Sequence, residues 1–311
     1  MASNVSNTNQ TSGLDASRLS RRGFLKLSGL GAAAVAGTSL LTACGPSTQT
    51  AGSASGASSS ASSSFGDNGT MRVGMEVAYP PYNFQVSQES ENTIPVQGQD
   101  GAYADGYDIV FAKKIGEALG LTPVAVKMDF SGLVEGLTSG TIDIICGGMT
   151  ATDERRQSID FSDPYWDGHY GLLVKKGSPL ASATSFADFA GAAVLGQRDT
   201  LLDDVIDEIP NVNHLEPVDS VPAQLSAISN GACDAVTYDV ENAKGLLASN
   251  PDLVQVEFNG SPILFSEDAP INAGIAKGQD DVLKKINDCI NAVSQDDRQA
   301  YWDAVQQRLP E

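Results

Sequence analysis

The chain has 311 residues, of which 39 are acidic and 19 basic, giving a formal net charge of −20. So acidic a chain is a poor partner for nucleic acid, because phosphate binding needs a basic surface. The length allows one large or two medium domains, each with its own hydrophobic core. Composition thus excludes nucleic-acid binding and favours a well-solvated globular protein.

The first feature along the chain is a basic segment followed by a short apolar run. Arg21 and Arg22 lie in the order Ser-Arg-Arg-Gly-Phe-Leu-Lys, which is typical of twin-arginine export signals. The apolar run over 27–41 is short, rich in glycine and alanine, and ends in Leu-Thr-Ala-Cys, which resembles a lipobox. We therefore predict that residues 1–43 are a signal peptide that is removed, and that Cys44 is acylated. This anchors the protein by lipid to the outer side of the bacterial cell membrane; the alternative is an uncleaved anchor helix.

A segment of low complexity follows the acylated cysteine. Residues 44–69 consist mostly of serine, alanine, glycine and threonine. Such a composition cannot bury enough apolar surface to order the chain. The sequence therefore predicts a flexible tether between the membrane and a body that begins at residue 70.

In the first half of the body, short β-rich runs alternate with helical periods. Apolar residues recur on one face of a helix that stops at Gly120. Strands are predicted at Met71–Val77, Pro123–Met128 and Ile142–Cys146, and helices at Asp108–Leu119 and Ser131–Leu137. This βαβ rhythm predicts an α/β fold with a largely parallel sheet.

The rhythm restarts in the second half. Strands are predicted at Gly171–Lys175, Ala192–Leu195, Ala235–Tyr238 and Ile271–Ala276, and helices at Leu201–Ile209, Ala223–Asn230 and Asp280–Val293. Two α/β lobes joined by a waist account for this order. Ligands of such sheets bind at the loops beyond the strand ends and between lobes.

Two glycines follow the buried strand at 142–146. Gly147 and Gly148 let the backbone approach a ligand closely. Thr150 then offers a hydroxyl, and Thr152 is placed to cap the start of a helix. This segment is the strongest candidate for a ligand-binding loop.

Arg155 would lie on the first turn of that helix. Its guanidinium is suited to clasp a carboxylate through two parallel hydrogen bonds. From the residues alone, the favoured interpretation is that Arg155 and Arg156 are solvated helix cations paired with Asp153 or Glu154, since surface arginines are common.

An ordered series of short motifs extends through the body. The motifs are Gly106-Tyr107-Asp108-Ile109-Val110, Phe130-Ser131-Gly132-Leu133, Gly148-Met149-Thr150, Glu154-Arg155, Ile159-Asp160-Phe161-Ser162 and Pro164-Tyr165. The series resembles the family-3 bacterial extracellular solute-binding proteins, the polar amino-acid receptors of ABC importers, over residues 71–309. The resemblance implies a fold of the type II periplasmic-binding-protein class, two α/β lobes joined by a two-strand hinge with the ligand cleft between them. The expected boundaries are 70–172 for the first part of lobe 1, 173–260 for lobe 2 and 261–311 for the return to lobe 1.

The resemblance also implies how lobe 1 binds the ligand. Arg155 matches the arginine that binds the α-carboxylate of an amino acid. Backbone groups at Gly148 and Thr150 would hold the carboxylate and the α-ammonium, with Gly147 beside them.

In lobe 2, Thr200 matches the position whose amide and hydroxyl touch the carboxylate, at a helix start that suits an anion. Arg198-Asp199 replaces the Gly-Thr or Gly-Ser pair that is usual there, which puts the local geometry in question. Asp239 matches an acid placed against the α-ammonium. Glu241 takes that role if the alignment slips by two residues.

Ligand preference is expected from three side chains of lobe 1. Glu76 matches a position facing the distal end of the ligand, and Tyr79 and Phe130 match aromatic positions that stack on its side chain. An acid between aromatic faces suits a guanidinium or ammonium group. We therefore predict arginine or lysine as the ligand, with glutamine, histidine or another polar amino acid as alternatives.

The predicted function is that of a monomeric receptor which captures an amino acid by hinge closure and delivers it to the permease of an ABC importer. The alternative from another class is an enzyme on the same fold, similar to cyclohexadienyl dehydratases, with Glu76 as general acid. Asp239 speaks against it, because an acid dedicated to an α-ammonium serves capture. A third possibility is a sensor that docks on a receptor protein.

No residues suggest a cofactor or a metal. His169 and His214 lie near no motif of nucleophile or metal chemistry, and no glycine-rich phosphate loop is present. Cys146, Cys233 and Cys289 form no close pair typical of metal or redox sites. Buried apolar positions are expected for them, and one disulfide of open pairing is possible in an oxidising compartment.

Overall fold

The computed structural model describes residues 65–266 and 268–309. The predicted export signal, Cys44 and most of the tether lie outside these residues. The described, packed part of the chain begins a few residues before the predicted end of the tether at residue 69. Phe65 already packs against a hydrophobic core, and Asp67–Gly69 forms a 3-10 turn. Burial of an aromatic ring stabilises the folded state, so the folded body includes Phe65.

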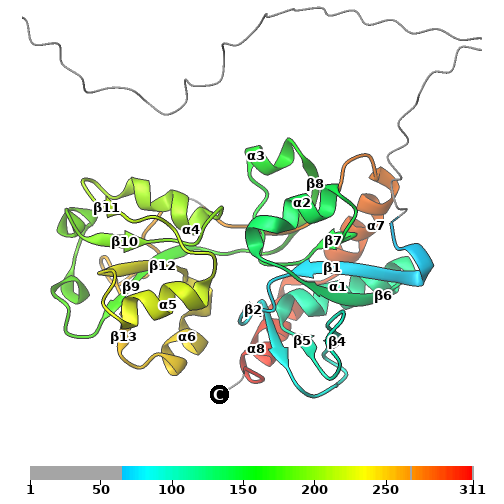
Figure 1. The fold of residues 1–311 in the computed structure, drawn as a ribbon, viewed down its shortest axis with the longest axis horizontal. Helices are drawn as coiled ribbons and strands as arrows, with labels where there is room; N and C mark the ends of the chain where they lie inside the picture. Colours follow the sequence, from blue (N-terminus) through cyan, green and yellow to red (C-terminus); the bar gives the residue numbers. More distant parts are fainter. Residues whose placement is uncertain (1–64, 267, 310–311) are drawn as a thin grey trace, which may run out of the picture. The chain divides into compact units, whose positions relative to one another are not determined.

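The first sheet has five strands in the order β6-β1-β7-β14-β8 (Figure 1). β1 is parallel to β6 and β7, whereas β14 is antiparallel to β7 and β8. The strands are β1 (Thr70–Met75), β6 (Thr122–Lys127), β7 (Ile144–Ile145), β8 (Ile159–Trp166) and β14 (Ile271–Ala276). We call the part of the protein built on this sheet lobe 1.

Helices pack on this sheet, and a small antiparallel sheet lies beside it. The helices are α1 (Tyr107–Leu119), α2 (Leu133–Thr138), α3 (Asp153–Arg156), α7 (Asp280–Asn291) and α8 (Gln295–Gln306), with a 3-10 turn η3 (Phe130–Gly132). The small sheet has the order β2-β3-β5-β4, with β2 (Ala78–Tyr79), β3 (Asn83–Val86), β4 (Ile94–Pro95) and β5 (Tyr103–Asp105). The prediction of a helix over 108–119 is confirmed, and Gly120 ends it with a φ of 70°.

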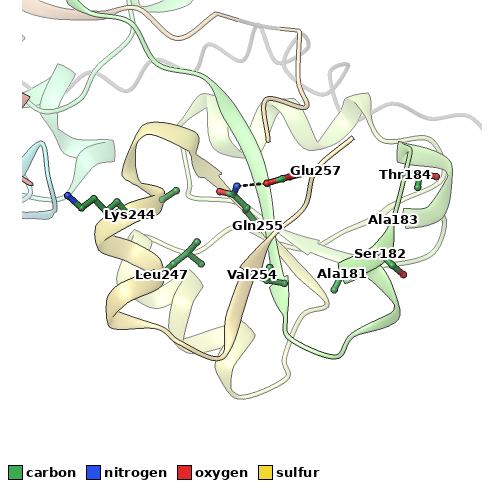
Figure 2. Close-up of a pocket in the computed structure, with 10 residues that line it drawn as sticks. Ala181, Ser182, Ala183, Thr184, Lys244, Leu247, Val254, Gln255 and Glu257 are labelled. Atoms are coloured by element: carbon green, nitrogen blue, oxygen red, sulfur yellow. Dashed lines mark hydrogen bonds between the residues drawn. The ribbon is translucent and has the colours of Figure 1, made fainter. Parts of the chain in front are cut away.

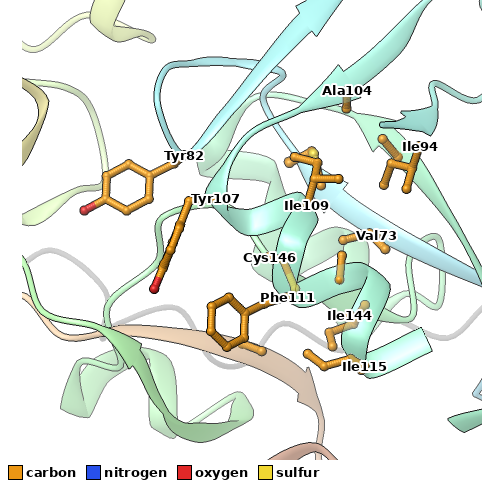
Figure 3. Close-up of a cluster of buried hydrophobic side chains, with 14 of the residues drawn as sticks. Val73, Tyr82, Ile94, Ala104, Tyr107, Ile109, Phe111, Ile115, Ile144 and Cys146 are labelled. Carbon is orange, nitrogen blue, oxygen red and sulfur yellow. The ribbon is translucent and has the colours of Figure 1, made fainter. Parts of the chain in front are cut away.

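The main core of lobe 1 lies between α1 and the first sheet (Figure 3). Ile109, Phe111 and Ile115 of α1 are fully buried there, as are Val73 and Ile144 of the strands. Each such side chain stabilises the fold by about 1.5–3 kcal/mol relative to an exposed one. This packing holds α1 rigidly against the strands whose ends carry the site.

The second sheet, with the order β11-β10-β12-β9-β13, forms lobe 2. Its strands are β9 (Tyr170–Lys175), β10 (Ala193–Leu195), β11 (Asn213–His214), β12 (Ala235–Asp239) and β13 (Leu253–Gln255). Its helical segments are α4 (Leu201–Asp204), α5 (Val221–Ser229), α6 (Ala243–Ser249), η4 (Pro179–Ser182), η5 (Phe186–Phe189), η6 (Val205–Glu208) and η7 (Val240–Asn242). The predicted single helix over 201–209 is wrong. It is one α-turn that tightens to 3-10 geometry where Val205 and Ile206 are both buried.

The chain passes between the sheets twice. The passages lie between β8 and β9 and between β13 and β14, and they pair with each other through Gly168 and Ala269, whose amides donate to each other's carbonyls at 3.1 and 3.0 Å. The predicted boundary after residue 172 falls inside β9, whereas the one after residue 260 falls between β13 and β14.

Within residues 65–266 and 268–309, no helix is both long and apolar enough to cross a membrane. Cys146 and Cys233 are buried, Cys289 is half-buried, and all three are free thiols. The possible disulfide among them is therefore not formed.

Replacing Phe65 tests where the folded body begins. Phe65→Ala should lower the free energy of unfolding by about 1–2 kcal/mol, since a half-buried ring contributes part of the value for full burial. Urea unfolding of the full chain measures the change, with the exposed Gln99→Ala as control. Equal midpoints for the two variants would place Phe65 in the tether after all.

Candidate functional site

A cleft lined by residues of both lobes lies between them, and the free space inside it is about 20 Å³. This is far below the volume of small-molecule sites, so the lobes must part before a small molecule can enter. The walls of this cavity are formed by Glu76, Tyr79, Phe130, Gly148, Thr150, Arg155, Tyr170, Gln197, Thr200, Leu201, Leu202 and Asp239. The structure thus brings together eight of the nine predicted ligand-binding residues, from segments far apart in the sequence.

Gly147 is the predicted residue that does not line the cavity. A Cβ atom there would face Leu133 and the Gly74 carbonyl in the interior of lobe 1. Gly148 has a φ of 64°, and a Cβ atom on it would lie 3.0 Å from the Tyr79 ring. Gly148 therefore needs to be glycine for both conformation and space.

Arg155 points its guanidinium into the site. Thr152 caps α3, as predicted, and accepts the Arg155 amide at 3.2 Å. The Arg155 Nη1 donates to the carbonyl of Thr150 at 2.7 Å, and Nη2 donates to the carbonyl of Asp199 in lobe 2 at 2.8 Å. Burial lowers the pKa of this guanidinium from its usual value. Of its five N–H groups, three remain for a ligand.

Arg155 makes no ion pair with Asp153 or Glu154 among the described residues. Its guanidinium instead lies over the Phe130 ring, 5.1 Å from the ring centroid. One face of Phe130 is therefore occupied by Arg155. The other predicted aromatic, Tyr79, stacks on Tyr82 with centroids 5.2 Å apart.

Thr200 begins α4 in lobe 2. Its hydroxyl donates to the carbonyl of Gln197 at 2.8 Å and accepts the Leu202 amide at 3.1 Å. The preceding Asp199 has a φ of 59°, in the left-handed region. Aspartate tolerates that region better than most residues. The departure from the expected glycine-containing pair thus keeps a glycine-like backbone.

Glu76 is 8% exposed and faces a residue of the other lobe. Gln197 Nε2 donates to Glu76 Oε1 at 3.1 Å and to the carbonyl of Asp219 at 3.3 Å. Burial raises the pKa of Glu76 to about 7; the hydrogen bond from Gln197 opposes this rise, and the charge of Asp129 adds to it. Gln197 was not predicted, although its place directly before Arg198-Asp199-Thr200 was a usable signal.

Asp239 ends β12 and is 5% exposed. Its side chain accepts no hydrogen bond from any residue in the described part of the chain. Burial raises the pKa of Asp239 well above its ordinary value, and the nearby charge of Glu241 adds to the shift. Glu241, the alternative in the prediction, is bound to the backbone and ring nitrogens of His169 at 2.9 and 2.7 Å and does not line the cavity.

Tyr170, Leu201 and Leu202 complete the walls and were also missed. Tyr170 begins β9, directly after the first passage between the lobes. The two leucines belong to the turn that Thr200 caps. Their positions follow from how the lobes close, which no local motif records.

A larger hollow, of about 710 Å³, lies on the surface of lobe 2 beside β13 (Figure 2). It is lined mainly by small and aliphatic side chains, among them Ala181, Leu247 and Val254. Lys244 and Thr184 lie at opposite ends of it, and Glu257 is bound to its neighbour Gln255 at 2.8 Å. Because no charged groups converge there, the interlobe cavity is the better candidate site.

A mixed α/β fold with a charged cavity between two hinged lobes defines a two-lobed solute-binding protein. The chain matches the bacterial extracellular solute-binding proteins, family 3, over residues 71–301, and it belongs to that family. The prediction made from the motifs is thereby confirmed.

Several relatives are amino-acid-binding proteins. The chain is 35% identical over 186 residues to the probable histidine-binding protein of Campylobacter jejuni, covering 60% of this chain and 66% of that protein. It is 27% identical over 203 residues to the arginine-binding extracellular protein ArtP of Bacillus subtilis, covering 62% and 77%. Among solved structures, it resembles an ancestral arginine-binding protein bound to arginine, with 29% identity, a TM-score of 0.62 and coverage of 77% and 97%. All three are named as binding proteins.

The left-handed backbone of Asp199 can be tested by substitution. Asp199→Asn should bind ligand like the wild type, because asparagine also tolerates positive φ. Asp199→Val should lose roughly 1–2 kcal/mol of stability and bind more weakly, because a β-branched residue resists this conformation and moves the carbonyl bound by Arg155. Urea unfolding and calorimetric titration measure both effects. Because the Asp199 side chain is exposed, its replacement removes no buried packing. Equal stability and affinity of the two variants would show that the left-handed conformation does not matter.

Proposed function

We propose that the protein is the substrate-binding component of an ABC importer and that its ligand is a cationic amino acid, arginine or lysine. The observation that carries the proposal is a cavity walled by one buried cation and two buried acids, one of which has no hydrogen-bond donor among residues 65–266 and 268–309. An amino acid with a positive side chain offers the complementary set of one anion and two cations. The arginine-binding relatives support the same assignment.

The α-carboxylate is assigned to Arg155. Its remaining N–H groups and the neighbouring Thr150 and Thr200 surround one end of the cavity. Charge-assisted hydrogen bonds of this kind are roughly twice as strong as neutral ones. Arg155 therefore provides binding energy for every amino acid, whatever its side chain.

The α-ammonium is assigned to Asp239. A buried carboxylate without a hydrogen-bond donor is costly, and it avoids the cost by taking up a proton or a cation. A ligand ammonium supplies the missing charge and up to three N–H donors. This is the strongest argument for capture of an amino acid over another anion.

The distal end of the ligand is assigned to Glu76 and Gln197. Gln197 already places an N–H donor against Glu76, in the position that the distal N–H groups of arginine or lysine would take up. Tyr79 also lines the cavity and would provide apolar surface for the aliphatic stem. Glutamine and histidine remain the alternative ligands, because a protonated Glu76 can hydrogen-bond to neutral groups.

Closure of the lobes is assigned to two contacts across the cleft, from Arg155 to the Asp199 carbonyl and from Gln197 to Glu76. Hinge closure removes the ligand from water, which strengthens its charged contacts. The closed form, acting as a monomer, would then be recognised by the permease. Export through the signal at 1–43 and lipid anchoring at Cys44 would keep the receptor beside that permease.

A second candidate function is catalysis on the same fold. A pKa of about 7 at Glu76 is suited to a general acid at neutral pH, which favours this reading. Against it, Glu76 is bound to Gln197, and Asp239 has the environment of an ammonium site. The relatives named as binding proteins also favour capture.

Arg155→Ala should weaken binding of every amino acid at least a hundredfold, because the buried carboxylate loses its charged partner. Arg156→Ala is the matched control, since Arg156 lies on the same turn and contacts Phe161 instead. It should bind within threefold of the wild type. Isothermal titration of refolded, ligand-free protein with the twenty amino acids measures both. Unchanged affinity in Arg155→Ala would overturn the site assignment.

The affinity for arginine should depend on pH through Glu76. Below pH 7 the side chain is mainly protonated, whereas the cation binds the carboxylate, so binding then releases a proton. Affinity should therefore fall about tenfold from pH 8 to pH 6. Glu76→Gln should weaken arginine binding and flatten this pH dependence while sparing glutamine. The variant also controls for His169 and His214, which it leaves in place; a retained pH dependence would assign the effect to another group.

A further inference from the structure

We propose that Asp108 is a positioning residue of the binding site, a buried carboxylate that ties together the two loops of lobe 1 carrying Glu76 and Gly148. The inference rests on the proposed function and extends it to a residue that does not touch the cavity. Asp108 is the second residue of α1 and is completely buried. A carboxylate in such a place is stable only when its oxygens are well hydrogen-bonded.

Three donors meet this carboxylate. Asn83 Nδ2 donates to Oδ2 at 2.8 Å, the Tyr165 hydroxyl donates to Oδ1, and the backbone N–H of Gly148 lies near the same carboxylate. Gly148 lines the cavity in a left-handed conformation. Asp108 therefore connects the start of α1 to one wall of the site.

Asn83 connects the same carboxylate to the other loop. Its Oδ1 accepts the backbone N–H of Val77 at 2.8 Å, and Val77 directly follows Glu76. Val77 has a φ of 55°, which is strained for a β-branched residue. A strained residue keeps its conformation only when its surroundings hold it, and the Asn83 side chain is one such support.

The main chain of α1 adds a second attachment to this loop. The amide of Tyr107 donates to the Pro81 carbonyl, and that of Asp108 donates to the Tyr82 carbonyl, both at 2.9 Å. Figure 3 shows Tyr82 and Tyr107 together at this end of α1. The start of α1 thus holds the loop from Val77 to Asn83 through its backbone, and the Asp108 side chain extends that hold to Gly148.

Lobe 1 contains a second buried carboxylate that serves as a matched control. Asp143 is 5% exposed and accepts Arg72 through its backbone N–H at 2.7 Å, Nε at 3.0 Å and Nη2 at 2.6 Å. Neither Asp143 nor Arg72 lines the cavity or bonds to a residue that does, within the described part of the chain. Loss of this carboxylate should affect stability alone.

The test compares Asp108→Asn, Asn83→Ala and Asp143→Asn in the full chain, each titrated with arginine, lysine, histidine and glutamine under conditions where circular dichroism shows it folded. Asp108→Asn and Asn83→Ala should weaken every ligand that the wild type binds by at least tenfold, because both loops move. Asp143→Asn should lower the urea midpoint but bind within twofold of the wild type. Asn83→Ala removes no charge, so it separates positioning from the electrostatic effect of Asp108.

Exchanging the two side chains gives a stricter test. In Asn83→Asp with Asp108→Asn, the new carboxylate at 83 still accepts the Val77 amide and now accepts the amide group at 108. The double variant should therefore bind more tightly than Asp108→Asn alone, a coupling that independent losses cannot produce.

The outcomes separate the two proposals. If the wild type binds none of the four amino acids, the proposed function fails. If it binds one and the folded Asp108→Asn and Asn83→Ala variants bind within twofold of it, the positioning role is wrong. Should Asp108→Asn not fold, Asn83→Ala decides the matter alone. An exchanged pair that binds no more tightly than a folded Asp108→Asn variant would also overturn the inference.

Discussion

Charge held out of water between two lobes is the constraint on which this structure depends. Arg155 is stabilised there by hydrogen bonds to two backbone carbonyls, one from each lobe. Glu76 accepts a hydrogen bond from a side-chain amide of the opposite lobe, and its pKa is raised. Asp239 has neither a donor nor a counter-ion among the described residues. Closure and ligand binding are therefore coupled in the proposed function. The buried charged groups of the closed cleft would all have partners only when a ligand supplies the missing charges.

Most of the fold could be predicted because its rules are local. The apolar face over 108–119 and the apolar run at 142–146 are visible in the local sequence pattern, which is enough to predict a buried helix and a buried strand. The missed elements have no such local pattern. β8 contains Pro164 and pairs with β14, more than a hundred residues later, and its alternation of apolar and polar residues stops after Ser162. α8 is largely polar, with Trp302 and Val305 as its buried residues, so its apolar face is too narrow to detect.

The site residues also differ in whether a local sequence signal identifies them. Arg155 could be predicted because the surrounding motifs resemble those of a known family, whereas its local sequence alone also fitted a solvated surface arginine. Gln197 was missed because its importance comes from Glu76, 121 positions away and in the other lobe, and its place before Arg198-Asp199-Thr200 was the local signal. Gly147 is the converse case, a residue that was predicted for the site but does not line the cavity. It adjoins Gly148, but the two glycines face different sides of the backbone, and only a structure shows which of them meets the cavity.

Backbone strain links the site to the fold that supports it. Among the described residues, five non-glycine residues have positive φ, and three of these are asparagines, which tolerate it well. The other two, Val77 and Asp199, each directly adjoin a cavity residue, one in each lobe. Local preference does not explain Val77, so the surrounding contacts must impose its conformation, whereas aspartate tolerates a positive φ. Both residues nevertheless adjoin the same cavity, one from each lobe. The backbone thus points to the same place as the charged side chains.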